Sequence, residues 1–432
     1  MIRKVLIFLH RWNGLLLAAF LTIIGLTGSL LAFNSELEHV FAPQLFAHAR
    51  PGVPPLDLPT LVVRAQALLP NASVRGVVYV EPDHAQVYFV PKQDPSTGRP
   101  YKLGFDEFFI DPWSGAELGR RMNGDLRQGL INVMPFLYSV HWTLAMGEFG
   151  HWSFGIVALM WSLDCFVGFY LTLPRGHRGF WRRWKFAWFV KWSASTFRIN
   201  FDLHRAGGLW LWAMLFIFAW SSVMMNLRPV YEMVMSTVFE YKSPRENFSQ
   251  NAHLNEHPVL DWYAAAATGR RFMEQQASRK GFAVEQPLGL WYDPKSGTYF
   301  YEVRSDHDVF RRSPKGGSTY VAVDGNTGEF LTLFQPTGAK LGNTVESWLY
   351  ALHMTRVFGR PYQIFVCVLG MAVAMISATG VYIWWKKRHG RKLGALAAAK
   401  IAHASAVALA PVSKRQSQTS EFSQINPKGD KS

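Results

Sequence analysis

Four histidines stand beside the ends of long apolar stretches, and they fall into a repeating pattern. His10 lies in Leu-His-Arg-Trp-Asn-Gly-Leu, and His204 lies in the similar segment Leu-His-Arg-Ala-Gly-Gly-Leu at an offset of 194 residues (204 − 10). His141 in Val-His-Trp-Thr is matched by His353 in Leu-His-Met-Thr at an offset of 212 residues (353 − 141). Imidazole is a common axial ligand of haem iron, and a helical bundle can enclose the macrocycle. The pattern therefore predicts histidine pairs that ligate haem.

A single histidine near a helix end is usually a solvated interfacial residue. Four of them at repeat-matched positions favour one shared role, which we interpret as bis-histidine ligation of two b-type haems. Arg11 and Arg205 each follow a histidine of the first pair and could neutralise haem propionates, as Arg356 could at the other membrane face. The same arginines also suit an ordinary role as positive charges that fix membrane orientation.

Two further ionisable residues have no ionisable counterpart in the other half of the chain. Asp164 lies deep in an apolar stretch, where a carboxylate is costly, so it could relay protons or pair with a buried donor. His151 follows His141 closely and is most simply interfacial, with a role in the site as the alternative.

Four apolar stretches supply the helices that must position these residues. Each is close to the length of about 20 residues that a spanning helix needs, and they cover residues 15–33, 152–173, 209–227 and 364–385. The formal charge of +15 gathers beside the ends of these stretches, a distribution that indicates membrane topology and not nucleic-acid binding. Cys165 and Cys367 both lie within apolar stretches, which argues against a disulfide framework, and no C-x-x-C-H motif for covalent haem occurs.

Basic segments predict the orientation of the spans. Residues 175–198 hold seven Lys or Arg and no acid, so this loop and both termini are predicted to be cytoplasmic in a bacterial inner membrane. The first stretch is too long for a cleaved signal peptide. The predicted order is a first span (5–35), a periplasmic module (36–135), a surface helix with the second span (136–173), a basic cytoplasmic loop (174–200), a third span (201–227), a second periplasmic module (228–345), a fourth span (346–386) and a disordered cytoplasmic tail (387–432).

Each half of the chain thus reads as helix, periplasmic α+β module, helix. Alternation over residues 74–90, and over 299–303 with 320–323, predicts small antiparallel sheets, while 60–69 and 262–276 have helical spacing. The fold class is a mainly α membrane protein with four transmembrane helices from two tandem repeats. Units with the same orientation should pack about a pseudo-two-fold axis along the membrane normal, which would bring the matched histidines together at each membrane face.

These motifs resemble the PepSY-associated transmembrane family over roughly residues 5–390. The likeness rests on His10-Arg11-Trp12 before the first span, Val140-His141 at the second, and the turn Asp111-Pro112-Trp113-Ser114-Gly115 in the first module. Within the family, the chain looks most similar to siderophore-linked inner-membrane ferric reductases, such as the ferrioxamine reductase. The resemblance implies two b-type haems with His10, His204, His141 and His353 as ligands, and reduction of ferric siderophore in the periplasm. Gly325-Asn326 replaces the proline of the second turn, so a shared substrate surface does not follow.

Two other functions stay open. One is an iron-chelate permease or accessory subunit of siderophore uptake, for which four unbroken spans make a poor pathway. The other is a PepSY-type module that binds proteins or regulates a peptidase, which leaves the matched histidines unexplained. No P-loop or Rossmann motif occurs, so a cytoplasmic carrier or a quinol must donate electrons. The expected partners are that donor, a ferric siderophore and the lipid bilayer, without nucleic acid.

Overall fold

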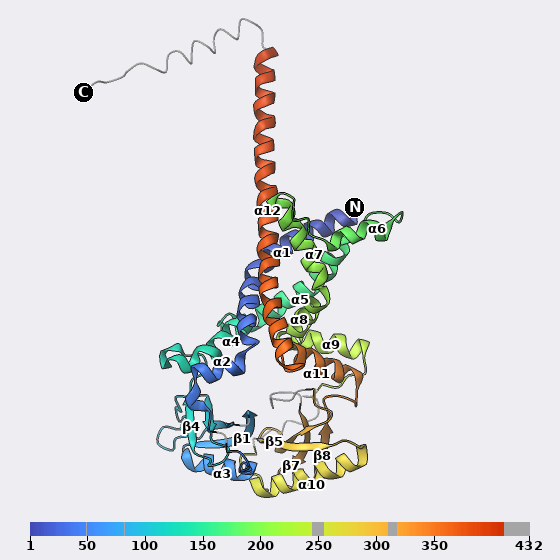
Figure 1. Cartoon of the computed structure of the whole chain (residues 1–432). Coiled ribbons are helices and arrows are strands. Elements are labelled where there is room, and N and C mark those ends of the chain that lie inside the picture. Colours follow the sequence, from blue (N-terminus) through green and yellow to red (C-terminus); the bar gives the residue numbers. More distant parts are fainter. Residues whose placement is uncertain (49, 82, 244–254, 310–317, 410–432) are drawn as a thin grey trace, which may run out of the picture.

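Apolar helices gather on one side of a β-sheet in the computed structural model of the chain (Figure 1). The structure describes residues 1–432 except 49, 82, 244–254, 310–317 and 410–432. Within these described residues, three helices are long and apolar enough to cross a membrane: α1 (Ile2–Leu31), α5 (Gly147–Thr172) and α12 (Gly359–Leu409). The chain is therefore a multi-pass membrane protein.

The segment predicted as an unbroken third span is broken in two. Helices α7 (Thr196–Trp210) and α8 (Trp212–Asn226) are long and apolar enough to cross a membrane only as a pair. The chain bends by 69° between them, at Leu211. Two tryptophans hold the bend by contacts with different elements, because Trp210 Nε1 donates to Trp188 O at 3.1 Å and Trp212 Nε1 donates to Cys165 O at 2.9 Å. The prediction that all four spans are unbroken is therefore wrong for the third, so unbroken helices no longer speak against a transport pathway.

The segment predicted as a disordered tail is helical over its first part. Helix α12 continues without interruption to Leu409 and extends away from the rest of the chain (Figure 1). This stretch is rich in alanine, leucine, lysine and arginine, which are the strongest helix formers, so the helix persists without packing partners. Residues 410–432 of the predicted tail lie outside the described residues.

The two predicted small sheets form one antiparallel sheet of eight strands. Its order is β4-β3-β2-β1-β5-β6-β7-β8, and β1 pairs with β5 through Gly76 with Trp291, Val77 with Leu290, and Val78 with Gly289. Pairing satisfies backbone groups that two separate sheets would each leave exposed at an edge. The strands are β1 (Ala72–Glu81), β2 (His84–Pro91), β3 (Glu107–Ile110), β4 (Glu117–Arg121), β5 (Val284–Asp293), β6 (Thr298–Ser305), β7 (Thr319–Asp324) and β8 (Phe330–Phe334).

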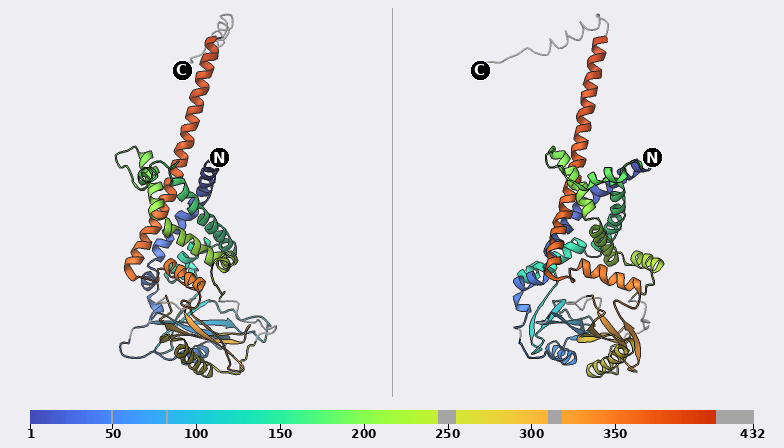
Figure 2. Two further views of the ribbon diagram at one scale, coloured as in Figure 1. Left: turned by 90° about the vertical axis from the view of Figure 1, so that its right-hand side faces the viewer. Right: turned by 45° about the vertical axis from the view of Figure 1, so that its right-hand side comes forward.

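Helices α3 (Leu58–Leu68) and α10 (Trp262–Lys280) cover the sheet face that turns away from the membrane helices (Figure 2). Their apolar side chains form one core with strands from both halves, including fully buried Leu61, Val77 and Leu290. The opposite face of the sheet therefore turns toward the membrane helices.

Shorter helices lie between the sheet and the spans or beside them. They are α2 (Asn34–Phe41), α4 (Val133–Thr143), α6 (Phe180–Trp184), α9 (Arg228–Val238) and α11 (Leu341–His353).

Helices α1 and α12 cross so closely that a Cβ on Gly25 would lie 2.6 Å from Gly370 O, and Ser29 Oγ donates to Cys367 O at 2.8 Å. Small residues permit this approach, as is common between membrane helices.

Candidate functional site

The structure brings both predicted histidine pairs together. His10 of α1 faces His204 of α7 with ring centroids 6.1 Å apart, and we call these residues the sheet-distal pair. His141 of α4 faces His353 of α11 with centroids 6.3 Å apart, and these form the sheet-proximal pair. Elements far apart in sequence thus present two imidazoles to each other at two levels of the helical region.

In the sheet-distal pair, the Nδ1 atom of each ring contacts a neighbouring helix. His10 Nδ1 lies 2.9 Å from a carboxylate oxygen of Asp164 in α5, and His204 Nδ1 lies 2.9 Å from Ile376 O in α12. A carboxylate and a carbonyl oxygen can only accept, so both Nδ1 atoms carry the proton. The carboxylate of Asp164 thus pairs with a donor, the partly buried imidazole of His10.

In the sheet-proximal pair, the Nδ1 atom of each ring contacts a hydroxyl group. His141 Nδ1 lies 3.0 Å from Thr27 Oγ1, and His353 Nδ1 lies 2.7 Å from Ser221 Oγ. Each hydroxyl already donates to a carbonyl one helical turn earlier, Thr27 to Ile23 O at 2.8 Å and Ser221 to Ile217 O at 2.7 Å. Each must therefore accept from its imidazole, which again places the proton on Nδ1.

All four rings consequently keep the lone pair of Nε2 for a ligand. An imidazole nitrogen binds a metal at about 2 Å and lies roughly 1.1 Å from its ring centroid, so two imidazoles on opposite sides of one metal have centroids about 6 Å apart. Both observed separations match this value. Among the described residues no group of three or more His, Cys, Asp or Glu could hold a metal ion.

Glycines give the rings room against neighbouring helices. A Cβ on Gly28 would lie 2.9 Å from His141 Cε1, and one on Gly380 would lie 3.1 Å from His204 Cε1. Gly168 stands in the same relation to His10, at 3.5 Å. Helix backbone at these glycines therefore fixes the orientation of three of the four imidazoles.

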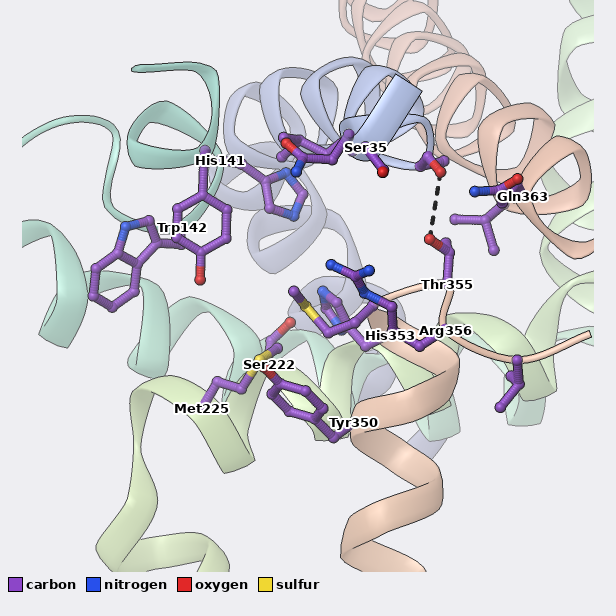
Figure 3. A pocket seen from close by; sticks show the side chains of 18 of the residues that line it. Ser35, His141, Trp142, Ser222, Met225, Tyr350, His353, Thr355, Arg356 and Gln363 are labelled. Atoms are coloured by element: carbon purple, nitrogen blue, oxygen red, sulfur yellow. Dashed lines mark hydrogen bonds between the residues drawn. The ribbon is translucent and has the colours of Figure 1, made fainter. Parts of the chain in front are cut away.

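A cavity of about 1560 Å³ lies between the sheet and the membrane helices, and the sheet-proximal pair lines it. In Figure 3, His141 and His353 reach toward this space from different elements, and Arg356 extends into it. His151 also lines it, with a buried Nδ1 that has no hydrogen-bond partner among the described residues. Six carboxyl side chains and four arginines line the cavity: Glu36, Glu38, Glu107, Glu302, Asp308, Glu346, Arg121, Arg228, Arg356 and Arg360.

The other two candidate arginines lie in different surroundings. Arg205 is held by Asp202 at 2.8 Å and by Phe186 O at 2.7 Å, so it stabilises the loop before α7. Arg11 borders a small pocket of about 240 Å³ with Trp384, Lys387 and Arg391 of α12. On this side the positive charges therefore come from Arg11, Lys387 and Arg391, and the sequence predicted a role in the site only for Arg11.

Two carboxyl groups that line the cavity have raised pKa values; one is in β6 and the other lies just after it. Burial raises the pKa of Glu302 to about 8, and its Oε2 has no hydrogen-bond partner among the described residues. Burial also raises the pKa of Asp308 to about 6, although hydrogen bonds from Thr319 and Ser305 oppose the rise. Both carboxyl groups can therefore stay protonated at mildly acidic pH, next to a molecule bound in the cavity.

The raised pKa of Glu302 predicts a pH-dependent stability. The folded chain binds a proton at Glu302 that the unfolded chain, with a pKa of 4.5, has released. The free energy of unfolding should therefore fall as the pH rises from about 5 to about 8. The slope for one proton is about 1.4 kcal/mol per pH unit. Thermal unfolding of Glu302→Gln should show a smaller loss over this range, with part remaining because of Asp308. Glu285→Gln, at an exposed position of β5, is the control; equal pH dependence in both variants would contradict the assignment.

Comparison with known proteins places the helical region and the sheet in one unit. Residues 8–387 match a family model described as PepSY-associated TM region. No curated protein matches the chain. The matched range contains all four histidines and every partner of their Nδ1 atoms described above.

Proposed function

The chain belongs to the PepSY-associated transmembrane family, and from this premise we propose that it is a di-haem b electron-transfer protein that reduces periplasmic ferric siderophores. One observation carries the proposal. The four imidazoles are arranged in two facing pairs, and the Nδ1 atom of every ring lies at hydrogen-bond distance from an oxygen atom, which leaves Nε2 for a ligand. An engaged second nitrogen that fixes the tautomer is the usual mark of a metal-ligating histidine.

The residues present fit haem better than a bare metal ion. Two imidazoles alone are too few ligands to enclose a bare metal ion. Each pair would instead hold a haem through its Nε2 atoms, and the bound haem would supply a one-electron Fe(III)/Fe(II) couple. Arg11, Lys387 and Arg391 would hold propionates at the sheet-distal pair, and Arg356 would do so beside His353.

The proposal includes the topology. The basic loop before α7 and the basic start of the extension of α12 lie on the side away from the sheet, so we place that side in the cytoplasm and the sheet in the periplasm of a bacterial inner membrane. In this arrangement α7 and α8 together act as a fourth span, and the two halves are tandem repeats. The sheet-distal pair then lies toward the electron donor, which is a cytoplasmic carrier or a quinol.

The cavity suits a bulky iron chelate. Its volume exceeds the 300–1,000 Å³ of ordinary small-molecule pockets, and it borders His141 and His353 directly. One electron converts the bound Fe(III) to Fe(II), which the hard oxygen ligands of a siderophore hold less tightly, so the metal is released.

Spectroscopy followed by rapid mixing tests the function. The purified protein should show the reduced-minus-oxidised spectrum of low-spin b-type haem. After anaerobic reduction by dithionite and removal of the excess, mixing with ferrioxamine, a ferric hydroxamate, should reoxidise the haems and produce Fe(II), which ferrozine detects. Bound haem that no ferric siderophore reoxidises would refute the reductase function and leave another acceptor.

A further inference from the structure

The two histidine pairs differ in the charge of the groups that their Nδ1 atoms contact. His10 meets the carboxylate of Asp164, whereas His204 meets a backbone carbonyl. His141 and His353 meet the neutral hydroxyls of Thr27 and Ser221. Among the described residues, only the sheet-distal pair therefore has an anionic partner at this position.

We infer that Asp164 is a positioning residue that lowers the reduction potential of the haem held by His10 and His204 below that of the haem held by His141 and His353. The inference rests on the proposed haem ligation but not on the identity of the acceptor. Its consequence is a downhill path for the electron, from the side away from the sheet toward the cavity.

The physical reason is the oxidation state that each partner favours. A carboxylate that accepts the Nδ1 proton makes the imidazole a stronger electron donor through Nε2, and this stabilises Fe(III) more than Fe(II). The Asp164 side chain is only 12% exposed, so its negative charge is weakly screened and also favours the more positive iron. A carbonyl or hydroxyl oxygen provides the same geometry without the charge.

Other charges near the sheet-distal pair do not cancel the effect of Asp164 on the reduction potential. Lys387 acts on His204 electrostatically, and Arg11 and Arg391 lie beside Lys387, so these cations oppose Asp164. The two propionates of a bound haem would offset them in part, whereas the hydrogen bond to His10 acts directly on the ligating ring. The helix α12 offers Ile376 at the position that matches Asp164, so the carboxylate is present in one half of the chain alone.

Redox titration of the purified protein tests the inference without any siderophore. Followed by the haem absorption bands, the wild type should titrate with two midpoint potentials. In Asp164→Asn, which keeps the shape of the side chain, the lower midpoint should rise and the higher one should stay. A tenfold loss of preference for Fe(III) would appear as a rise of about 59 mV for this one-electron couple. In Asp164→Glu, which keeps the carboxylate, the lower midpoint should return most of the way to its wild-type value. Ser221→Ala should leave the lower midpoint unchanged.

Single-haem variants assign the midpoints and keep the test independent of the folding of Asp164→Asn. His353→Ala should retain the haem of the sheet-distal pair and titrate at the lower potential, and His10→Ala should titrate at the higher one. The reverse order, or two unchanged midpoints in Asp164→Asn with both haems bound, would overturn the inference. A protein that binds no haem would overturn it together with the proposed function, whereas failure of siderophores to reoxidise the protein would overturn only the function.

Discussion

His353→Ala should lose the haem of the sheet-proximal pair and, with it, nearly all reoxidation by ferric siderophore. The ring of His353 lies in the cavity wall and is held by Ser221, so its removal leaves His141 as a lone ligand beside the proposed substrate. Haem content, measured as the pyridine haemochrome per protein, should fall by about half. Stopped-flow mixing of the dithionite-reduced variant with ferrioxamine should show only slow oxidation of the remaining haem.

His10→Ala is the matched comparison. It should lose a similar amount of haem, but the haem that it retains borders the cavity and should still be oxidised rapidly after chemical reduction. Equal oxidation rates in the two variants would contradict the assignment of the sheet-proximal pair to the substrate side. Full haem content in both would contradict histidine ligation itself.

Thr27→Val should weaken haem binding at the sheet-proximal pair by about 10–100-fold, the usual cost of removing a hydrogen-bond partner from a ligating histidine. Valine keeps the shape of threonine but cannot accept the Nδ1 proton of His141, so the ring loses both its fixed tautomer and its orientation. The rate of haem transfer to excess apomyoglobin measures the change.

A second threonine of the same helix provides the control. Thr22 Oγ1 donates to Ala18 O at 2.7 Å, much as Thr27 donates to Ile23 O, so Thr22→Val removes an equivalent backbone contact without touching a predicted ligand. Haem loss at the same rate in both variants would show that the hydroxyl of Thr27 acts on helix packing and not on His141.

The pairing of the histidines could be predicted from the sequence on the assumption of two repeated units with the same orientation in the membrane. Such units bring equivalent positions to the same membrane face. Thr27 and Ser221 are separated by the same number of residues as His10 and His204. The repeat therefore also marks these two hydroxyl residues as an equivalent pair. The acceptor for His204 is a backbone carbonyl, which every residue possesses, so no sequence signal marks it.

Other features depend on contacts between distant segments. The bend at Leu211 is held by Trp210 and Trp212 through carbonyls of a loop and of another helix, and tryptophan at a membrane boundary has many other uses. The join between β1 and β5 likewise has no local signature, because any strand with an unpaired edge could have formed it. Local alternation predicted β1, β2, β6 and β7, and helical spacing predicted α3 and α10, whereas it did not predict β4, β5 or β8.

The join between β1 and β5 also bears on how such a protein could have arisen. Across this seam, and across both histidine pairs, each half of the chain meets the corresponding part of the other, as the two subunits of a symmetric homodimer do. Under the proposed duplication, an ancestor with one copy would have built these sites only by self-association, and any acidic residue would have appeared on both sides of an iron. Fusion of the copies freed them to diverge, and Asp164 is a difference that only a fused chain can keep on one side.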